Sequence, residues 1–119
     1  MEQDDLDSLV AEWVPLPDVA DRLGVDVGQI RRMLQDRLLV GIRRGERRIL
    51  CVPGELIEAG EPLPDLRGTL IVLSDAGYSD EESLRWLFTP DDTLPGTPVE
   101  ALRSGRKTEV RRRAQALAF

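Results

Sequence analysis

Arginine and glutamine side chains dominate the one stretch of this chain whose residue types suggest chemistry. Arginine can donate two parallel hydrogen bonds to the edge of guanine, glutamine can pair in the same bidentate way with adenine, and clustered guanidinium groups bind phosphate oxygens. The candidate contact residues are Gly28, Gln29, Arg31, Arg32, Gln35, Arg43, Arg44, Arg47 and Arg48. These residues favour contact with a nucleic acid over catalysis.

Several residue combinations typical of catalytic or metal sites are missing from the sequence. The chain has no histidine, which excludes Ser-His catalysis. Its single cysteine, Cys51, stands between two apolar residues and is expected to be a buried thiol. One cysteine makes neither an intramolecular disulfide nor a zinc site of the usual kind. We therefore expect a protein that is not an enzyme and that needs no metal or cofactor.

Two short helices joined at Gly24 would position the candidate residues. Pro17 suits the start of a helix over residues 18–23, because its missing N–H needs no partner in a first turn. Gly24 can adopt the positive φ of a tight corner. Asp26 is expected to cap a second helix over residues 27–37. This arrangement is a helix-turn-helix, whose second helix enters the major groove of DNA.

A β-hairpin, or wing, is predicted directly after the second helix. Residues 39–42 and 48–52 have the composition of short strands, and Gly45 lies in the arginine-rich turn between them. Such a turn would carry guanidinium groups to the DNA backbone. Because successive strand residues point to opposite faces, we expect two or three of the four arginines at 43–48 to touch DNA.

Positive charge is concentrated in two segments of an acidic chain. The formal net charge is −6 over 119 residues. Residues 27–52 carry seven arginines and two acids, a net charge of +5, and residues 101–119 again have a net charge of +5. The local field over the predicted motif favours a phosphate ligand, whereas the acidic total counts against tight non-specific DNA binding.

The remaining segments are predicted to be mostly helical. Apolar residues recur at helical spacing over residues 4–13, one more helical turn is expected at 55–59, and residues 60–64 are expected to form a stiff connector. Further helices are expected to begin near Leu66, Ser79, Pro98 and Lys107, with a capping box at Ser79.

The predicted fold class is mainly α with a small β-hairpin wing. Residues 1–60 are predicted to form a winged helix-turn-helix DNA-binding domain. Residues 61–119 are predicted to form a small helical domain that packs on it.

Six basic side chains gather around the last predicted helix. They are Arg103, Arg106, Lys107, Arg111, Arg112 and Arg113. Three interpretations remain open: a solvated face that complements the helix dipole, a second surface for phosphates, or a surface for a protein partner. Residues 94–105 are also similar, over a short stretch, to the partner-binding domain of some antitoxins from toxin–antitoxin pairs.

Residues 16–25 together with residues 30–34 resemble the winged helix-turn-helix of MerR-like and excisionase-like proteins. Val52-Pro53 before a helical turn is typical of that group. The whole chain, including residues 86–90 and 102–108, resembles a family of small actinobacterial winged-helix DNA-binding proteins that have their own C-terminal helical domain. The resemblance implies double-stranded DNA as the ligand.

In that family the resemblance also implies a link to Ser/Thr protein kinase signalling. Ser8 is the one hydroxyl residue in the N-terminal segment, so a phosphorylation site there would have little choice of acceptor. The chain departs from MerR-type regulators because no long heptad helix follows the wing, so we expect a monomer. It has no run of about 18 apolar residues and no signal-peptide pattern at its start, which favours a cytoplasmic protein without a membrane span.

The sequence therefore predicts a non-enzymatic DNA-binding protein, a transcriptional regulator or a nucleoid-associated factor, that places residues 27–37 in the major groove and the wing at residues 43–48 on the DNA backbone. The alternative is an interaction module whose C-terminal helical domain binds a toxin, a kinase or a component of transcription, because winged helices also serve as protein-binding folds.

Overall fold

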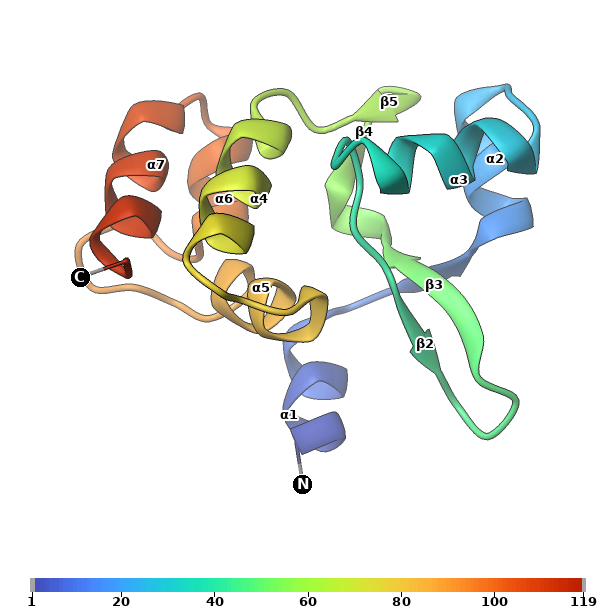
Figure 1. The fold of residues 1–119 in the computed structure, drawn as a ribbon, viewed down its shortest axis with the longest axis horizontal. Helices are drawn as coiled ribbons and strands as arrows, with labels where there is room; N and C mark the ends of the chain where they lie inside the picture. Colours follow the sequence, from blue (N-terminus) through green and yellow to red (C-terminus); the bar gives the residue numbers. More distant parts are fainter. Residues whose placement is uncertain (1, 119) are drawn as a thin grey trace.

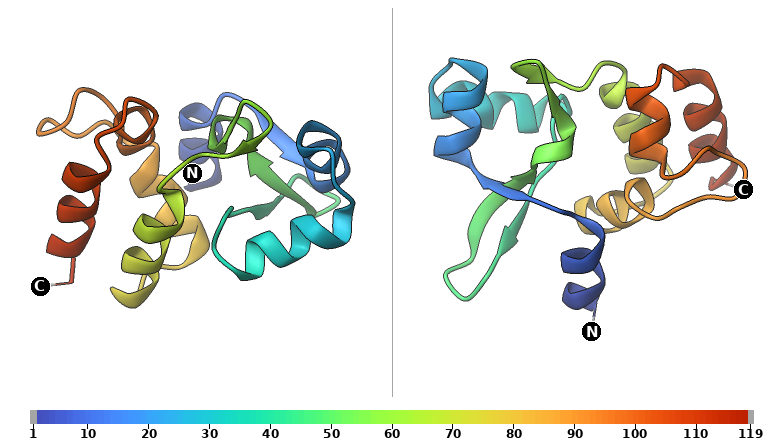
Figure 2. Two further views of the ribbon diagram at one scale, coloured as in Figure 1. Left: turned by 90° about the horizontal axis from the view of Figure 1, so that it is seen from above. Right: turned by 180° about the vertical axis from the view of Figure 1, so that it is seen from behind.

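The computed structural model describes residues 2–118 of the chain, and the side chains of residues 6–118. The helix-turn-helix and the main sheet form one side of the molecule, and the later helices form the other (Figure 1). The same division is visible from above and from behind (Figure 2). The fold is mainly helical with small antiparallel sheets, which confirms the predicted class.

A helix-turn-helix is formed by α2 (Leu16–Leu23) and α3 (Val27–Gln35). Gly24 ends α2 with a left-handed φ of 69°, as its position in the sequence predicts. The side chain of Asp26 accepts a hydrogen bond of 2.8 Å from the backbone N–H of Gln29, so the predicted N-cap of α3 is confirmed.

The second helix is shorter than predicted. It ends at Gln35 and not at residue 37, because Arg37 adopts a left-handed φ of 63° that cannot continue an α-helix. Ile30 is fully buried on the inner side of α3, whereas Val27, Met33 and Leu34 are half-buried.

Three antiparallel strands form the main sheet, in the order β1-β3-β2. They are β1 (Trp13–Pro15), β2 (Ile42–Arg44) and β3 (Ile49–Pro53). The β2–β3 hairpin is the predicted wing, and it extends away from the body of the molecule (Figure 1). Val14 and Val52 face each other across β1 and β3 and are both buried. The first strand of the wing starts at Ile42, later than predicted.

The predicted helix over residues 4–13 is wrong past Leu9. Helix α1 (Glu2–Leu9) ends there, and Trp13 begins β1, where it pairs with Pro53 of β3. Val10 is buried, so the apolar residues at helical spacing in this segment do include core residues, although the segment is not all helical. The backbone hydrogen bonds of β1 come from a strand about 40 residues later in the chain, and local periodicity carries no signal of such a partner.

The predicted helical turn at residues 55–59 is right only in its first part, and the predicted connector at 60–64 is wrong. A 3₁₀ turn, η1 (Gly54–Leu56), is followed by a hairpin of β4 (Ile57–Glu58) and β5 (Glu61–Pro62). Ala59 and Gly60, the two residues between these strands, both have positive φ. Positive φ at both central residues is what a tight type I′ hairpin turn requires.

The second half is helical, as predicted. Its helices are α4 (Leu66–Asp75), α5 (Asp80–Leu87), α6 (Pro98–Arg103) and α7 (Lys107–Ala116). The capping box at Ser79 is present, and Thr97 forms a second one before α6. Helix α4 packs against α7, and α1 packs against α5.

One hydrophobic core runs through both halves of the described chain. It includes Val19, Ile30 and Val52 from the first half and Leu70, Leu84 and Leu87 from the second. Cys51 is 6% exposed, as expected of a buried thiol. In residues 2–118 no helix has the length and apolar character needed to cross a membrane.

Candidate nucleic-acid interface

The predicted contact residues on the second helix share its solvent-facing side. All five are exposed: Gly28, Gln29, Arg31, Arg32 and Gln35. Their spacing along α3 places them opposite or beside the buried Ile30. Among the side chains that the structure describes, Arg31 and Arg32 form no ion pair, so both guanidinium groups remain available to a ligand.

The wing separates two neighbouring arginines onto opposite faces of the sheet. Arg43 pairs in register with Leu50 and is exposed, and its Nη1 donates a hydrogen bond of 3.0 Å to the backbone oxygen of Arg48. Arg44 pairs in register with Ile49 and points to the other face. Strand alternation therefore separates Arg43 from Arg44, as the sequence predicts, whereas Arg47 and Arg48 lie in the turn and not in a strand.

A surface groove of about 320 Å³ lies between the helix-turn-helix and the wing. We call it the arginine groove, because Arg31 of α3 and Arg43 and Arg48 of the wing line it together. Its other lining residues are Leu16, Pro17, Val27, Ile49 and Leu50. The fold thus gathers around one groove three cations that lie up to 17 positions apart in the sequence.

Arg44 does not share this groove. Its side chain is 11% exposed and forms a salt bridge with Asp7 of α1. Its guanidinium carbon also lies 4.6 Å from the centroid of the Trp13 ring, which is cation–π geometry. Arg44 therefore connects the wing to α1 and β1 and is not presented to a ligand.

The turn of the wing keeps its remaining arginines at the surface. Gly45 and Arg48 both have positive φ, at 76° and 55°. Arg47 and Glu46 lie between them and are exposed. Among the described side chains neither Arg47 nor Arg48 forms an ion pair.

The second basic cluster is largely occupied by contacts within the protein. Arg103 donates a 2.7 Å hydrogen bond to the backbone oxygen of Glu55, and Arg113 donates one of 2.7 Å to the hydroxyl of Thr93. Arg106 pairs with Glu109 at 3.1 Å, and Lys107 lies 3.6 Å from Asp65. These contacts support a structural role for the cluster over a second phosphate surface.

The contacts that link the end of α3 to α4 and α5 were not anticipated from the sequence. Arg37 contacts Asp80 of α5 and Ser74 of α4, and Arg67 donates a hydrogen bond to the backbone oxygen of Asp36. The only sequence signal is an arginine at the position after a helix C-cap, where glycine is usual. This signal can be interpreted only when the last residue of α3 is known.

The two halves of the chain match two family models. Residues 1–57 match the one described as the winged helix-turn-helix domain of DNA-binding protein Rv2175c. Residues 63–118 match the one described as the Rv2175c C-terminal domain of unknown function.

Sequence and structure comparisons agree with these matches. The chain is 38% identical over 117 residues to "DNA-binding protein Rv2175c" of Mycobacterium tuberculosis, covering 87% of this chain and 79% of the relative. It also superposes on "NMR structure of Rv2175c" with a TM-score of 0.81 and 36% identity, covering 91% of this chain and 82% of the other. The chain therefore belongs to the Rv2175c family, in which a winged helix-turn-helix domain is followed by a C-terminal helical domain.

Proposed function

We propose that this protein binds double-stranded DNA, with α3 in the major groove and the wing on the backbone, and that it acts as a transcriptional regulator without enzymatic activity. The observation that carries the proposal is the arginine groove, where Arg31, Arg43 and Arg48 converge between α3 and the wing. The relative from Mycobacterium tuberculosis is named as a DNA-binding protein, which supports the proposal.

The contact residues divide by their position. Gln29, Arg32 and Gln35 lie on the exposed side of α3, where their side chains would meet base edges. The exposed Gly28 leaves the first turn of α3 without a side chain that would hinder close approach to the groove.

The cations of the arginine groove, together with Arg47 at the wing tip, would bind phosphates on either side of the base contacts. Arg44 holds the wing in place and makes no DNA contact in this proposal. This assignment departs from the sequence prediction, which included Arg44 among the contact residues.

We assign residues 1–60 to DNA binding and residues 61–119 to a helical domain that packs on them. We further propose that the protein acts in the cytoplasm and binds DNA as a monomer, since no helix of the described chain exceeds ten residues and a long dimerisation coiled coil is therefore missing from it.

The test is fluorescence anisotropy of a labelled mixed-sequence DNA duplex, measured across a salt series. Each phosphate contact contributes about 0.9 to the slope of log affinity against log salt concentration. We expect Arg31→Gln to weaken binding and to reduce the slope by about one such step.

Arg112→Gln is the matched control, because Arg112 is also an exposed helical arginine and lies on α7, away from the arginine groove. The control should bind with the wild-type slope. Equal slopes for the two variants would show that the assigned face is wrong. No binding even at low salt would favour the interaction module.

A further inference from the structure

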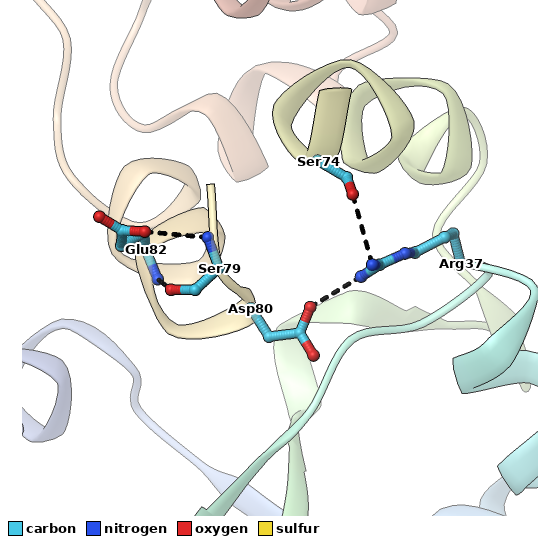
Figure 3. A network of polar contacts seen from close by, with 5 residues as sticks. All are labelled: Arg37, Ser74, Ser79, Asp80 and Glu82. Atoms are coloured by element: carbon cyan, nitrogen blue, oxygen red, sulfur yellow. Dashed lines mark hydrogen bonds and ion pairs between the residues drawn. The ribbon is translucent and has the colours of Figure 1, made fainter. Parts of the chain in front are cut away.

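The C-terminal end of α3 is tied to the second half of the chain by the side chain of Arg37. Its Nη1 lies 2.7 Å from Oδ1 of Asp80, in the first turn of α5. Its Nη2 lies 3.4 Å from the hydroxyl oxygen of Ser74 on α4. Figure 3 shows the guanidinium group between these two helices. One arginine therefore contacts both α4 and α5.

The backbone of Arg37 is held in an uncommon conformation for this contact. The N–H of Leu38 donates to the oxygen of Met33 and the N–H of Arg37 donates to the oxygen of Leu34, which is a Schellman motif. The residue in the position of Arg37 has a left-handed φ, here 63°, and is usually glycine. Arginine adopts this φ at a steric cost that glycine would not incur, and here its side chain makes two contacts that glycine could not make.

A second contact from α4 reaches the same end of α3. Nε of Arg67 donates a 2.8 Å hydrogen bond to the backbone oxygen of Asp36, the C-cap residue of α3. Unpaired carbonyl groups at a helix C-terminus carry partial negative charge, which a nearby arginine neutralises. Arg67 therefore gives the carbonyl group of Asp36 a hydrogen-bond donor and links the last turn of α3 to α4.

The partner of Arg37 is itself fixed in position. The hydroxyl of Ser79 accepts a hydrogen bond from the N–H of Glu82, and the N–H of Ser79 donates to the Glu82 carboxylate at 2.9 Å. This capping box holds the first turn of α5, from which Asp80 projects toward Arg37 (Figure 3). A continuous chain of contacts thus runs from the capping box of α5 to the end of α3.

Apolar packing does not fill this junction. A hollow of about 150 Å³ lies beside the ion pair, between Leu34 of α3 and Leu50 of β3. Polar contacts from α4 and α5 are therefore well placed to set the angle at which the end of α3 leaves the body. The DNA-facing side chains Arg32 and Gln35 lie on this last part of α3.

We propose that the C-terminal helical region braces α3 for DNA recognition, with Arg37, Arg67 and Asp80 as positioning residues that do not themselves touch DNA. This gives a role to the region that corresponds to the domain of unknown function. The inference rests on the proposed function, because it assumes that α3 is the helix that reads DNA.

The first test compares Asp80→Asn with Glu81→Gln on the tightest-binding duplex selected from a random library. Both variants remove one negative charge from the first turn of α5, and each loses one arginine partner, Arg37 or Arg85. We expect Asp80→Asn to bind about two- to fivefold more weakly than Glu81→Gln, the range that an exposed ion pair supports, with an unchanged salt slope.

This comparison separates bracing from direct contact. If Arg37 bound a phosphate, releasing it from Asp80 would strengthen binding and steepen the salt dependence. Tighter binding by Asp80→Asn than by Glu81→Gln would therefore overturn the proposal. Equal affinity of the two variants would overturn it as well.

The second test is Arg37→Gly, which removes the brace but relieves the steric cost of the left-handed φ. We expect thermal stability to be unchanged or higher while affinity for the same duplex falls about threefold or more at an unchanged salt slope. A wild-type affinity, or a slope reduced by one phosphate contact, would overturn the brace.

Arg31→Gln, measured beside these variants, tells the two proposals apart. If it weakens binding while Asp80→Asn and Arg37→Gly do not, the brace alone is wrong. If it too has no effect, the assigned DNA-binding face is wrong and the brace is overturned with it.

Discussion

The guanidinium group of Arg44 lies over the indole ring of Trp13, 4.6 Å from the ring centroid, and forms a salt bridge with Asp7. Arg43, its neighbour in the chain, points to the opposite face of the wing and lines the arginine groove. Two adjacent arginines of one strand therefore have different surroundings: one anchors the wing to α1 and β1, and the other lies at the groove where the proposed function places a phosphate.

Replacing Arg44 should cost stability, whereas replacing Arg43 should cost DNA affinity. A cation–π contact contributes about 0.5–2 kcal/mol and an exposed ion pair up to about 1 kcal/mol, so Arg44→Ala should lower the free energy of unfolding by about 1–2 kcal/mol. Arg43→Ala should change it by less than about 0.5 kcal/mol. Urea denaturation measures both. The assignment of Arg44 would be contradicted by a stability equal to that of Arg43→Ala.

Arg32 and Arg47 should affect DNA binding in different ways. Arg32→Ala removes a donor from the exposed side of α3 and should reduce discrimination between a preferred duplex and its single-base variants by about 1–3 kcal/mol. Arg47→Ala should weaken binding to all duplexes equally and reduce the salt slope by about 0.9. The affinities of both variants for one set of duplexes would check this. If Arg32→Ala weakened binding to all duplexes equally and Arg47→Ala reduced discrimination, the proposed docking arrangement would be wrong.

Arg48→Gly should make the wing more stable and bind DNA less well. Arg48 has a left-handed φ of 55°, which glycine adopts without the steric cost of about 1 kcal/mol. The change also removes one cation from the arginine groove. We expect a small rise in melting temperature together with weaker binding. Gly45→Ala is the opposite control: it should destabilise the wing by about 1 kcal/mol, since its φ is 76°.

Stability should fall in acid because several carboxylates are stabilised in their charged form. The pKa of Glu12 is lowered by a hydrogen bond from Arg22 and by its charge, and the pKa of Glu82 is lowered by hydrogen bonds with Ser79. A carboxyl group whose pKa is lower when folded stabilises the fold above its unfolded pKa, about 4, and loses this effect as pH falls through the lower folded value.

Urea midpoints at pH 7 and below pH 4 measure this dependence. Glu12→Gln and Glu82→Gln should each flatten it, because the neutral side chain has no proton to take up. Glu46→Gln is the control, as Glu46 is exposed and has no ion-pair partner among the described side chains. If both variants lost stability in acid as steeply as the wild type, Glu12 and Glu82 would not be the carboxylates responsible.

Cys51 should be unreactive in the folded protein. Burial raises the pKa of its thiol, so little thiolate exists at neutral pH, and the side chain is only 6% exposed. A thiol reagent at pH 7.5 should therefore modify the native protein slowly and the urea-unfolded protein quickly. Rapid modification without denaturant would show that β3 opens readily.

Much of the local structure could be predicted from the sequence, because its signals act over a few residues. Asp26 and Ser79 cap helices through hydrogen bonds to N–H groups three positions away, and Gly24 turns the chain through its own φ. Such interactions need no distant partner, which is why the helix-turn-helix, the second strand of the wing and the helices of the second half lie close to their predicted positions, whereas the first strand of the wing shares only Ile42 with its prediction.

The tertiary structure decided everything that depends on a distant partner. Trp13 is in a strand because β3 lies beside it, and Arg44 turns inward because strand register places it over Trp13 and beside α1. The role of Arg37 depends on Asp80, 43 positions later in the chain. Residue type and local spacing make an arginine a candidate for phosphate contact, but whether its charge is already paired is set by which segments the fold brings next to it.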